Sequence, residues 1–516
     1  MEEKCAVEKK RGLSDLIKNE DWLAVWLGFL IIIIILAGVR PKMPSFKWET
    51  SGEFAATIEK SKPKAEKFAA DAQSKGETAV AEASTALKAA LDSGDRAGIG
   101  SAAKKLAETS KTAKDEGIKK KGGDIGKKIS GSAGALAEKV FSGENIGKIV
   151  IIGLGFLLIS SIGIILMGGS VGKYIIGFPV VYILANIAQF ISGNSTIHYY
   201  GLEYVIFALV IGLFISNVIG VPKWLMEAVR TEYFIKTGLV ILGAGILFKE
   251  ILQGGALGIV QGVCVVTVVW YACFWLSKKL KLDDDFAALL SSAVSICGVS
   301  AAIATCGAIE GDKKKLSYVT SLVLIVAVPM MIIMPWLVKT LGIPELVGGA
   351  WLGGTLDTSG SVVAAGALIS EPAMKTGVIV KFSQNVLIGV AAFLLSIWWT
   401  VKKGAAGGQK VSAGVIWDRF PKFVLGFIVA SIVFSFLLDS STVKDTKGLL
   451  GGMRTVWFAL AFTSIGLETR FKELVGMEGG RPAAAFIIAQ AFNVIWTLIL
   501  AYLLFGGILF AVPDIK

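Results

Sequence analysis

Histidine and cysteine are scarce in this chain. It has one histidine, His198, and five cysteines, which form no Cys-x-x-Cys pair and no Cys/His cluster. Zinc and haem sites depend on such ligands, so neither is expected, and the cysteines are interpreted as small apolar side chains rather than a disulfide framework. A G-x-x-x-x-G-K-[S/T] loop is also absent, which excludes a pump driven by a P-loop ATPase on the same chain.

Charged residues are few as well. They make up 18% of the 516 residues, against roughly 25% in soluble domains, whereas hydrophobic residues make up 54%. Apolar runs long enough to cross about 30 Å of hydrocarbon recur along the chain, so the sequence predicts an all-α polytopic membrane protein. The net charge of +12 is explained by basic loops beside membrane helices, and no nucleic-acid partner is expected.

The chain divides into four predicted regions. These are a segment at 1–21, a first transmembrane helix at 22–39, an insert rich in Ala, Lys and Glu at 40–147, and a transmembrane domain at 148–510. Large apolar residues are too few in the insert for a substantial core, so it is predicted to form two or three thin helices, with a mostly disordered segment as the alternative. About thirteen crossings are predicted, the first helix being followed by candidates near 148–168, 173–191, 203–219, 233–248, 257–276, 287–309, 316–338, 350–369, 378–400, 421–438, 455–470 and 484–508.

Lysines and arginines in the short loops predict the orientation. With the N-terminus inside, the cytoplasmic loops hold more of them than the outer loops do, the exception being the run at 313–315. The chain is therefore predicted to be a multi-pass protein of the cell (inner) membrane. Residues 1–21 would be cytoplasmic and the 40–147 insert extracytoplasmic.

Two similar stretches indicate an internal repeat. "KTGLVILGAGILFKEIL" at 236–252 resembles "WFALAFTSIGLETRFKEL" at 457–474, and each is followed by a Gly-rich turn and another apolar run. The two copies lie seven predicted crossings apart, so they would cross the membrane in opposite directions. Inverted repeats of this kind are typical of secondary transporters.

Two segments place glycines among hydroxyl side chains inside apolar surroundings. They are "SICGVSAA" at 295–302 and "GGTLDTSGSVVAAG" at 353–366. A helix broken at such a point exposes backbone N–H groups that attract anions and carbonyl groups that bind cations. Close packing of helices through small residues is the alternative interpretation. We therefore expect two broken helices that form a binding site.

Asp357 is the most informative single residue. A carboxylate inside a membrane is costly unless it is paired or protonated, so it is a functional candidate. Lys381 opens the next predicted apolar helix and could reach it, whereas a water-facing helix cap is the alternative for Asp357. The predicted substrate-binding or ion-binding residues are Ser295, Cys297, Gly298, Ser300, Thr305, Asp357, Thr358, Ser359, Gly360, Ser361, Lys381, Gln384 and Asn385.

From about residue 200 to 508 the sequence resembles the YeiH-type sulfate exporter family of membrane proteins. The resemblance rests on "LVILGAGILFKEIL", "KLDDDFAALLSSAVSICGVSAAIA", "VVAAG" at 362–366 with "IVKFSQNVLIG" after it, and "ALAFTSIGLETRFKEL". The Ser-Ile-Cys-Gly-x-Ser-Ala motif is the most specific of these. The resemblance implies inverted repeats with crossed broken helices.

This chain departs from the family pattern just before the Val-Val-Ala-Ala-Gly motif. Members usually carry His-Glu-x-x-Gln where this sequence has Asp357 to Ser361, and the basic residue expected after the equivalent of Lys381 is replaced by Gln384 or Asn385. The substrate and proton coupling of the family therefore cannot be transferred directly.

The sequence predicts a secondary active transporter of a small inorganic or organic anion, sulfate-like or sulfite-like on the grounds of the resemblance. The alternative is a Na⁺/H⁺-type exchanger centred on Asp357, and the alternative of another class is an envelope scaffold that works through the 40–147 insert. An enzyme is not expected, because no catalytic pair of carboxylates, metal cluster or activated nucleophile is recognisable. No cofactor is expected beyond a coupling H⁺ or Na⁺, the partners are the anion and the lipid bilayer, and association into a homodimer is left open.

Overall fold

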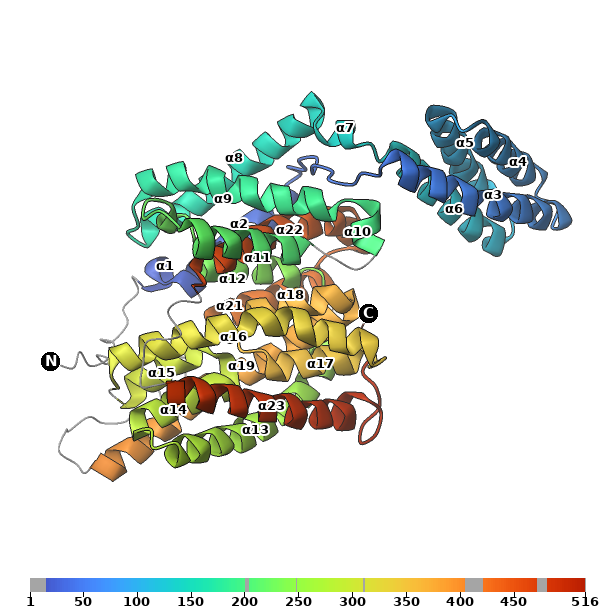
Figure 1. Cartoon of the computed structure of the whole chain (residues 1–516). Coiled ribbons are helices and arrows are strands. Elements are labelled where there is room, and N and C mark those ends of the chain that lie inside the picture. The colour runs from blue at the N-terminus through green and yellow to red at the C-terminus, as the bar shows by residue number, and fades with distance from the viewer. Residues whose placement is uncertain are drawn as a thin grey trace. The chain divides into compact units, whose positions relative to one another are not determined.

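The computed structural model describes residues 15–199, 204–246, 248–309, 311–403, 421–470 and 480–515. Its elements are helices, with one isolated β-bridge between Trp48 and Asn194 (Figure 1). The chain forms two compact units. A membrane unit comprises residues 1–42, 153–188 and 205–516, and an insert unit comprises residues 43–152 and 189–204. Residues 1–14, most of the predicted cytoplasmic segment, lie outside the described residues.

The insert unit contains four main helices, where the sequence predicts two or three. They are α3 (Ser51–Ser74), α4 (Thr78–Ser93), α5 (Arg96–Thr109) and α6 (Glu116–Gly134), with the short helices α7 (Ala137–Val140) and α10 (Ser195–Tyr199). Their starts follow from capping residues: Thr50 and Glu53 form a capping box, and Asp95 and Asp115 accept backbone N–H bonds at the starts of α5 and α6. One small core, which includes Phe54, Phe68, Leu87, Leu91, Ile99, Leu106, Ile118 and Ile129, joins the four helices.

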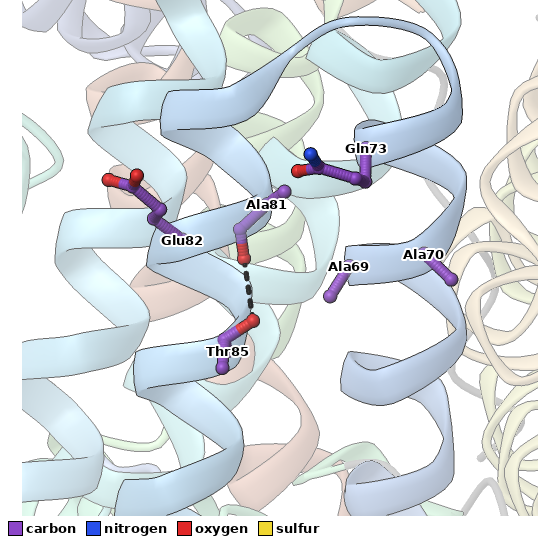
Figure 2. A pocket seen from close by; sticks show the side chains of 6 residues that line it. All are labelled: Ala69, Ala70, Gln73, Ala81, Glu82 and Thr85. Atoms are coloured by element: carbon purple, nitrogen blue, oxygen red, sulfur yellow. Dashed lines mark hydrogen bonds between the residues drawn. The ribbon is translucent and has the colours of Figure 1, made fainter.

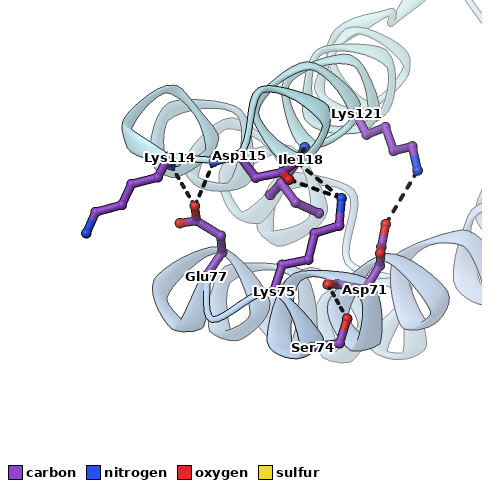
Figure 3. Close-up of polar contacts among 8 residues, drawn as sticks. All are labelled: Asp71, Ser74, Lys75, Glu77, Lys114, Asp115, Ile118 and Lys121. Carbon is purple, nitrogen blue, oxygen red and sulfur yellow. Dashed lines mark hydrogen bonds and ion pairs between the residues drawn. The ribbon is translucent and has the colours of Figure 1, made fainter.

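The turn between α3 and α4 is tied to the start of α6 by polar contacts. The Glu77 carboxylate accepts hydrogen bonds from the backbone N–H groups of Lys114 and Asp115, at 2.6 and 3.0 Å (Figure 3). The Lys75 ammonium lies 3.2 Å from the Asp115 carboxylate, and Lys121 lies 3.4 Å from Asp71. Exposed ion pairs contribute little each, so the backbone bonds to Glu77 carry most of this connection.

Alanines leave a groove of about 440 Å³ along the α3–α4 pair (Figure 2). Its walls carry Ala69, Ala70 and Gln73 from α3 and Ala81, Glu82 and Thr85 from α4. The Thr85 hydroxyl donates to the Ala81 carbonyl at 3.0 Å, so it is already engaged within its own helix. The groove therefore offers few free polar groups.

The ends of the insert unit are joined through Trp48. Its ring stacks on Phe190 at 5.2 Å between centroids, and its indole N–H donates to the Phe190 carbonyl at 2.8 Å. Glu53 accepts hydrogen bonds from the Thr196 backbone and the Asn194 side chain. Partial desolvation raises the pKa of Glu53, but hydrogen bonds from Thr196, Thr50 and Asn194 outweigh it and lower the pKa to about 2.

The membrane unit holds most of the other helices. They are α1 (Asp15–Lys18), α2 (Glu20–Leu36), α8 (Gly143–Leu166), α9 (Val171–Ser192), α11 (Tyr204–Phe214), α12 (Thr231–Gly243), α13 (Phe248–Lys279), α14 (Asp284–Ser292), α15 (Val299–Ile309), α16 (Lys313–Thr340), α17 (Glu345–Thr355), α18 (Ser359–Ile369), α19 (Glu371–Lys403), α21 (Lys422–Ile432), α22 (Ser440–Glu468) and α23 (Arg481–Phe505). Three π-helical turns, Ile215–Ile219, Ala293–Cys297 and Val433–Leu437, extend α11, α14 and α21.

Seven of the described helices are long and apolar enough to cross a membrane: α8, α9, α13, α16, α19, α22 and α23. Shorter apolar helices lie at Tyr204–Ile219, Val299–Ile309, Ser359–Ile369 and Lys422–Leu437, and α2 has 17 residues. The chain is thus a helical membrane protein, whereas the predicted count of about thirteen crossings is not confirmed. Hydropathy alone counts a short or interrupted apolar helix as a full crossing.

Helix contacts within the membrane unit fall into two groups. In one, α12 packs on α2, α21 and α22; in the other, α13, α14, α15, α17, α18 and α23 pack around one another and α19, as Figure 1 shows. Fewer contacts join the groups, through α12 with α18 and α13 with α21. We call these the α12 group and the α19 group.

An ion-pair cluster holds α2 against α12. The Lys236 ammonium lies 2.7 Å from Glu20 and 2.9 Å from Asp21, with Glu232 of its own helix at 3.8 Å. The Lys236 side chain is 13% exposed, so water screens these contacts poorly. The first apolar run is therefore anchored to a helix more than 200 residues later in the chain.

The cysteines differ in part from the sequence prediction. Cys264, Cys273 and Cys297 are free thiols, as expected. Cys306 is disulfide-bonded, so its interpretation as a plain apolar side chain is wrong. The sequence offered no spacing signal for this bond.

Candidate functional site

The first Gly/Ser-rich segment changes conformation at Gly298. The π-helical turn Ala293–Cys297 ends there, and α15 starts at Val299. Gly298 has a φ of +53°, in the left-handed range that glycine adopts without a Cβ penalty. The regular helical path is thus interrupted at the glycine of the Ser-Ile-Cys-Gly motif.

The second segment is extended between two helices. Leu356 follows α17, and both Leu356 and Thr358 have extended backbone conformations before α18 begins at Ser359. The Thr358 hydroxyl caps α18 by accepting the N–H of Ser361 at 3.0 Å, and the two hydroxyls lie 2.6 Å apart. The residues from Leu356 to Thr358 therefore separate two short helices.

The two segments touch each other. A Cβ atom on Gly298 would lie 2.9 Å from the Asp357 carbonyl oxygen, 3.1 Å from the Asp357 Cβ and 2.5 Å from a Val323 methyl group. Contacts that short leave no space for any side chain at residue 298. The structure thus brings Gly298 and Asp357, predicted from separate motifs, into direct contact.

Three side chains of α19 bind these segments, two of them through backbone carbonyl groups. The Lys381 ammonium donates to the Ile296 carbonyl and to Gln384 Oε1, both at 2.7 Å. Gln384 Nε2 donates to the Ser295 carbonyl at 2.7 Å, and Asn385 Nδ2 donates to the Ser359 hydroxyl at 3.2 Å. The carbonyl groups freed at the π-helical turn therefore have partners.

The position of these residues within their helix differs from the prediction. Lys381 was expected at the opening of an apolar helix near 378–400, whereas α19 begins at Glu371. Lys381, Gln384 and Asn385 therefore lie well inside the helix, and each is at most 3% exposed. Charged and polar residues precede Lys381 in the sequence, so hydropathy alone does not identify the first turns of α19.

Asp357 is buried, with 1% of its surface exposed. Neither carboxylate oxygen has a hydrogen-bond partner in the described part of the chain. The alternative of a water-facing helix cap is wrong, because the side chain is buried and Thr358 provides the cap. Lys381 and Gln490 are close enough to act on Asp357 electrostatically, but no ion pair within 4.0 Å joins Asp357 to Lys381. A buried carboxylate without a hydrogen-bond partner is costly when it is ionised.

Helix α23 supplies two partners that are not among the predicted site residues. Gln490 Nε2 donates to the Thr355 carbonyl at 2.9 Å, and Asn493 Nδ2 donates to the Val294 carbonyl at 3.1 Å. The Oε1 atom of Gln490 is buried without a partner among the described residues. One helix thus holds both segments, a connection for which the sequence gives no signal beyond two amides in an apolar run.

The other predicted residues divide into two sets. Cys297 and Ser361 are buried beside the contact, and a Cβ on Gly360 would lie 2.3 Å from the Ile235 side chain of α12. Ser300 is exposed on α15, and Thr305 is seven residues beyond Gly298, or about 10 Å along a helix. The contacts described above involve neither Ser300 nor Thr305.

No group of three or more His, Cys, Asp or Glu side chains that could hold a metal ion occurs among the described residues. The polar groups at the contact are a carboxylate, an ammonium, amides and hydroxyls. This set suits a proton, a monovalent cation or a small anion.

Comparisons with known proteins identify relatives of this chain. A family model described as Conserved hypothetical protein 698 matches residues 176–485. A UPF0324 membrane protein of Nitratidesulfovibrio vulgaris (strain Hildenborough) is 41% identical over 368 residues, covering 69% of this chain and 63% of that protein. Another from Rhodopirellula baltica is 42% identical over 348 residues, covering 66% and 64%.

A third relative, a UPF0324 membrane protein of Nitrosomonas europaea, is 35% identical over 356 residues and covers 60% of this chain and 72% of its own. The chain spans less than two thirds of the length of the first two relatives. No solved structure matches it significantly. These names describe membrane proteins and state no substrate.

Proposed function

Because the chain belongs to the Conserved hypothetical protein 698 family of membrane proteins, we propose that it is a secondary transporter of a small anion. The binding site is the contact between the segments at 295–302 and 353–366. In this proposal the two segments are broken helices that cross within the membrane. The observation that carries it is the buried contact of Gly298 with Asp357, with Lys381 bonded to the same segment.

The chemistry of the contact favours an anion. Helices α15 and α18 both begin there, and helix starts carry a partial positive charge. The Lys381 ammonium adds a full positive charge in a buried position. An anion bound at this place would be attracted by both, and a protonated Asp357 could donate a hydrogen bond to it.

Contacts around the two similar stretches support an inverted repeat. The Ser216 hydroxyl, in the turn after α11, donates to the Gly466 carbonyl of α22 at 2.8 Å. The Ser431 hydroxyl, beside the turn after α21, donates to the Ile246 carbonyl after α12 at 2.5 Å. Each copy thus accepts a serine hydroxyl bond from the segment that precedes the other copy, although residues 471–474 of the second copy lie outside the described residues.

The two helix groups support a mechanism of alternating access. The α19 group contains both interrupted segments, and the α12 group contains the helical parts of the repeated stretches in α12 and α22. Movement of the α19 group against the α12 group would expose the contact to one side of the membrane and then to the other. We propose an inner-membrane location with a cytoplasmic N-terminus and an outer insert, in line with the basic loops.

A Na⁺/H⁺-type exchanger is the second candidate, and the unpartnered Asp357 carboxylate favours it. A buried carboxylate without hydrogen bonds is costly when ionised, so uptake of a proton or a sodium ion would stabilise it. In this case Lys381 would compete with the ion for the same position.

Transport assays on the purified full chain in proteoliposomes separate the two candidates. Sulfate, sulfite and small carboxylates are offered with and without pH and sodium gradients, and ion flux is measured in their absence. Anion uptake that persists in reduced form in Asp357→Asn supports the anion transporter; sodium-driven proton flux without any anion, lost in Asp357→Asn, supports the exchanger.

The matched control is Asp445→Asn. This carboxylate lies on α22 and its side chain is 61% exposed beside Arg40. It should leave either activity unchanged. If no anion moves and no ion flux arises in the unaltered chain, the transport proposal fails.

A further inference from the structure

A pocket of about 230 Å³ lies where the two helix groups face each other. Its walls are the last turn of α12 with Gly245 two residues after it, the first residue of α19, Glu371, and one face of α22. The α22 face carries Lys447, Gly448, Gly451 and Arg454. A Cβ on Gly448 or Gly451 would meet nothing within 4 Å, so these glycines leave open space between the two cations.

The pocket carries an excess of positive charge. Lys447 and Arg454 are seven residues apart and therefore lie on the same helix face, about 10 Å from each other along the axis. Neither has an ion-pair or hydrogen-bond partner in the described part of the chain. Glu371 is the one carboxylate of the pocket; Lys375 lies 4.0 Å from it but 3.6 Å from Glu250, so Glu371 counts as one negative charge against the two cations of α22.

An unpaired arginine in a membrane helix requires an explanation. Charged side chains within membrane segments are costly and usually face a water-filled cavity on a substrate pathway. Arg454 is partly buried in α22, one of the seven helices that could cross a membrane. Arg454 lines the pocket, so its charge faces a cavity, as this generalisation expects.

Two helices lead from the pocket to the contact of the interrupted segments. A Cβ on Gly360 would lie 2.3 Å from Ile235 of α12 and 3.8 Å from Ile465 of α22. Along α12 the pocket at Gly245 is ten residues, or about 15 Å, from Ile235, and along α22 Arg454 is eleven residues, or about 16 Å, from Ile465. These distances equal half of a hydrocarbon layer of about 30 Å.

We infer that this pocket is an anion-binding mouth of the transport pathway, in which Lys447 and Arg454 concentrate small anions before they reach Asp357. The inference rests on the proposed transport function and adds a second, more peripheral binding place. It also gives the pathway a charge preference that does not depend on the protonation of Asp357.

The test uses charged thiol reagents, so the natural substrate need not be known. Gly451→Cys places a thiol three and four residues from Arg454 and Lys447, about 5–6 Å away on the helix surface. The modification rates by anionic sulfonatoethyl and cationic trimethylammonioethyl methanethiosulfonate are compared in the full chain. The signal of the native thiols is subtracted.

We expect the anionic-to-cationic rate ratio to fall about fivefold at physiological ionic strength when Lys447→Gln and Arg454→Gln are added, and by more in low salt. Lys444→Gln is the matched control, because it removes an exposed lysine of α22 that does not line the pocket. A ratio that is unchanged by the double substitution, or that falls equally in the control, overturns the inference.

Transport kinetics distinguish failure of this inference from failure of the proposed function. If anions are transported, Arg454→Gln should raise their KM several-fold with kcat nearly retained. If Arg454→Gln transports anions with an unaltered KM, the pocket is not part of the pathway, and the proposed transport function still stands. If no anion is transported but the ratio of modification rates falls as expected, the transport function is wrong, whereas the pocket still attracts anions.

Discussion

Gly298→Ala tests the contact between the interrupted segments most directly. The substitution adds one methyl group at a φ of +53° and a ψ of −107°, a backbone region that is almost confined to glycine and costs an L-residue roughly 1–3 kcal/mol. The same methyl group would lie 2.9 Å from the Asp357 carbonyl oxygen and 2.5 Å from Val323, and overpacking of this kind costs about 1–3 kcal/mol. The free energy of unfolding should therefore fall by about 2–6 kcal/mol.

Gly342→Ala is the control that separates the two contributions. Gly342 has a φ of +64°, but its added Cβ would meet nothing within 4 Å. It should cost only the backbone contribution of about 1–2 kcal/mol. Both variants are compared by denaturant titration of the full chain in mixed micelles and by anion uptake in proteoliposomes.

The predicted difference between these variants is the cost of the contact together with any extra backbone cost of the Gly298 conformation. Gly298→Ala should be less stable than Gly342→Ala by at least about 1 kcal/mol, and it should lose most of its transport while Gly342→Ala keeps it. Equal stability and equal transport would mean that residue 298 does not press against Asp357, and the proposed crossing would have to be abandoned.

Three further predictions use other parts of the chain. Lys381→Met should destabilise the protein by at least about 1–3 kcal/mol, because the buried Ile296 carbonyl and Gln384 Oε1 lose their common donor. If the Lys381 charge also stabilises the Asp357 carboxylate over a distance above 4.0 Å, adding Asp357→Asn should restore part of the loss in thermal melting; no restoration would show that the two do not interact. A tag in the 40–147 insert should be labelled on intact cells, and labelling only after permeabilisation would reverse the orientation. The pKa of Glu53 is lowered to about 2 from an ordinary 4.5, so its stabilisation of the insert unit is present above pH 4.5 and lost as the pH falls toward 2. Far-ultraviolet circular dichroism of Glu53→Gln should show a smaller loss of insert helicity over that range than the unaltered chain.

The sequence alone predicts the class of the protein and the location of its unusual segments. Low charge and repeated apolar runs identify a helical membrane protein, and the glycines and hydroxyls at 295–302 and 353–366 mark the places where the helices stop. These features are local, so they can be recognised without a structure. The contact of Gly298 with Asp357 joins residues about sixty positions apart, and only the family resemblance suggested it.

Other parts of the site could not be predicted because the role of each side chain depends on contacts with residues that are distant in the sequence. Gln490 and Asn493 are ordinary amides until α23 places them against the carbonyls of Thr355 and Val294. Arg454 looks like a residue of a loop or helix end until its pocket is seen. The helix count was not confirmed for a related reason, since an apolar window does not reveal whether a short helix continues across the membrane.

The Lys236 cluster has a consequence for the order in which the chain is assembled. The partners Glu20 and Lys236 are separated by 216 residues, which include the whole insert. At a synthesis rate of about 5–20 residues per second, about 10–40 s pass between the appearance of the two carboxylates on α2 and the appearance of their ammonium partner. During that time α2 is a nascent segment without its anchor, and any chaperone or insertase that acts on it has tens of seconds to do so. A slowed ribosome within the insert would lengthen this interval, so codon changes there should alter the yield of assembled protein without altering a single amino acid.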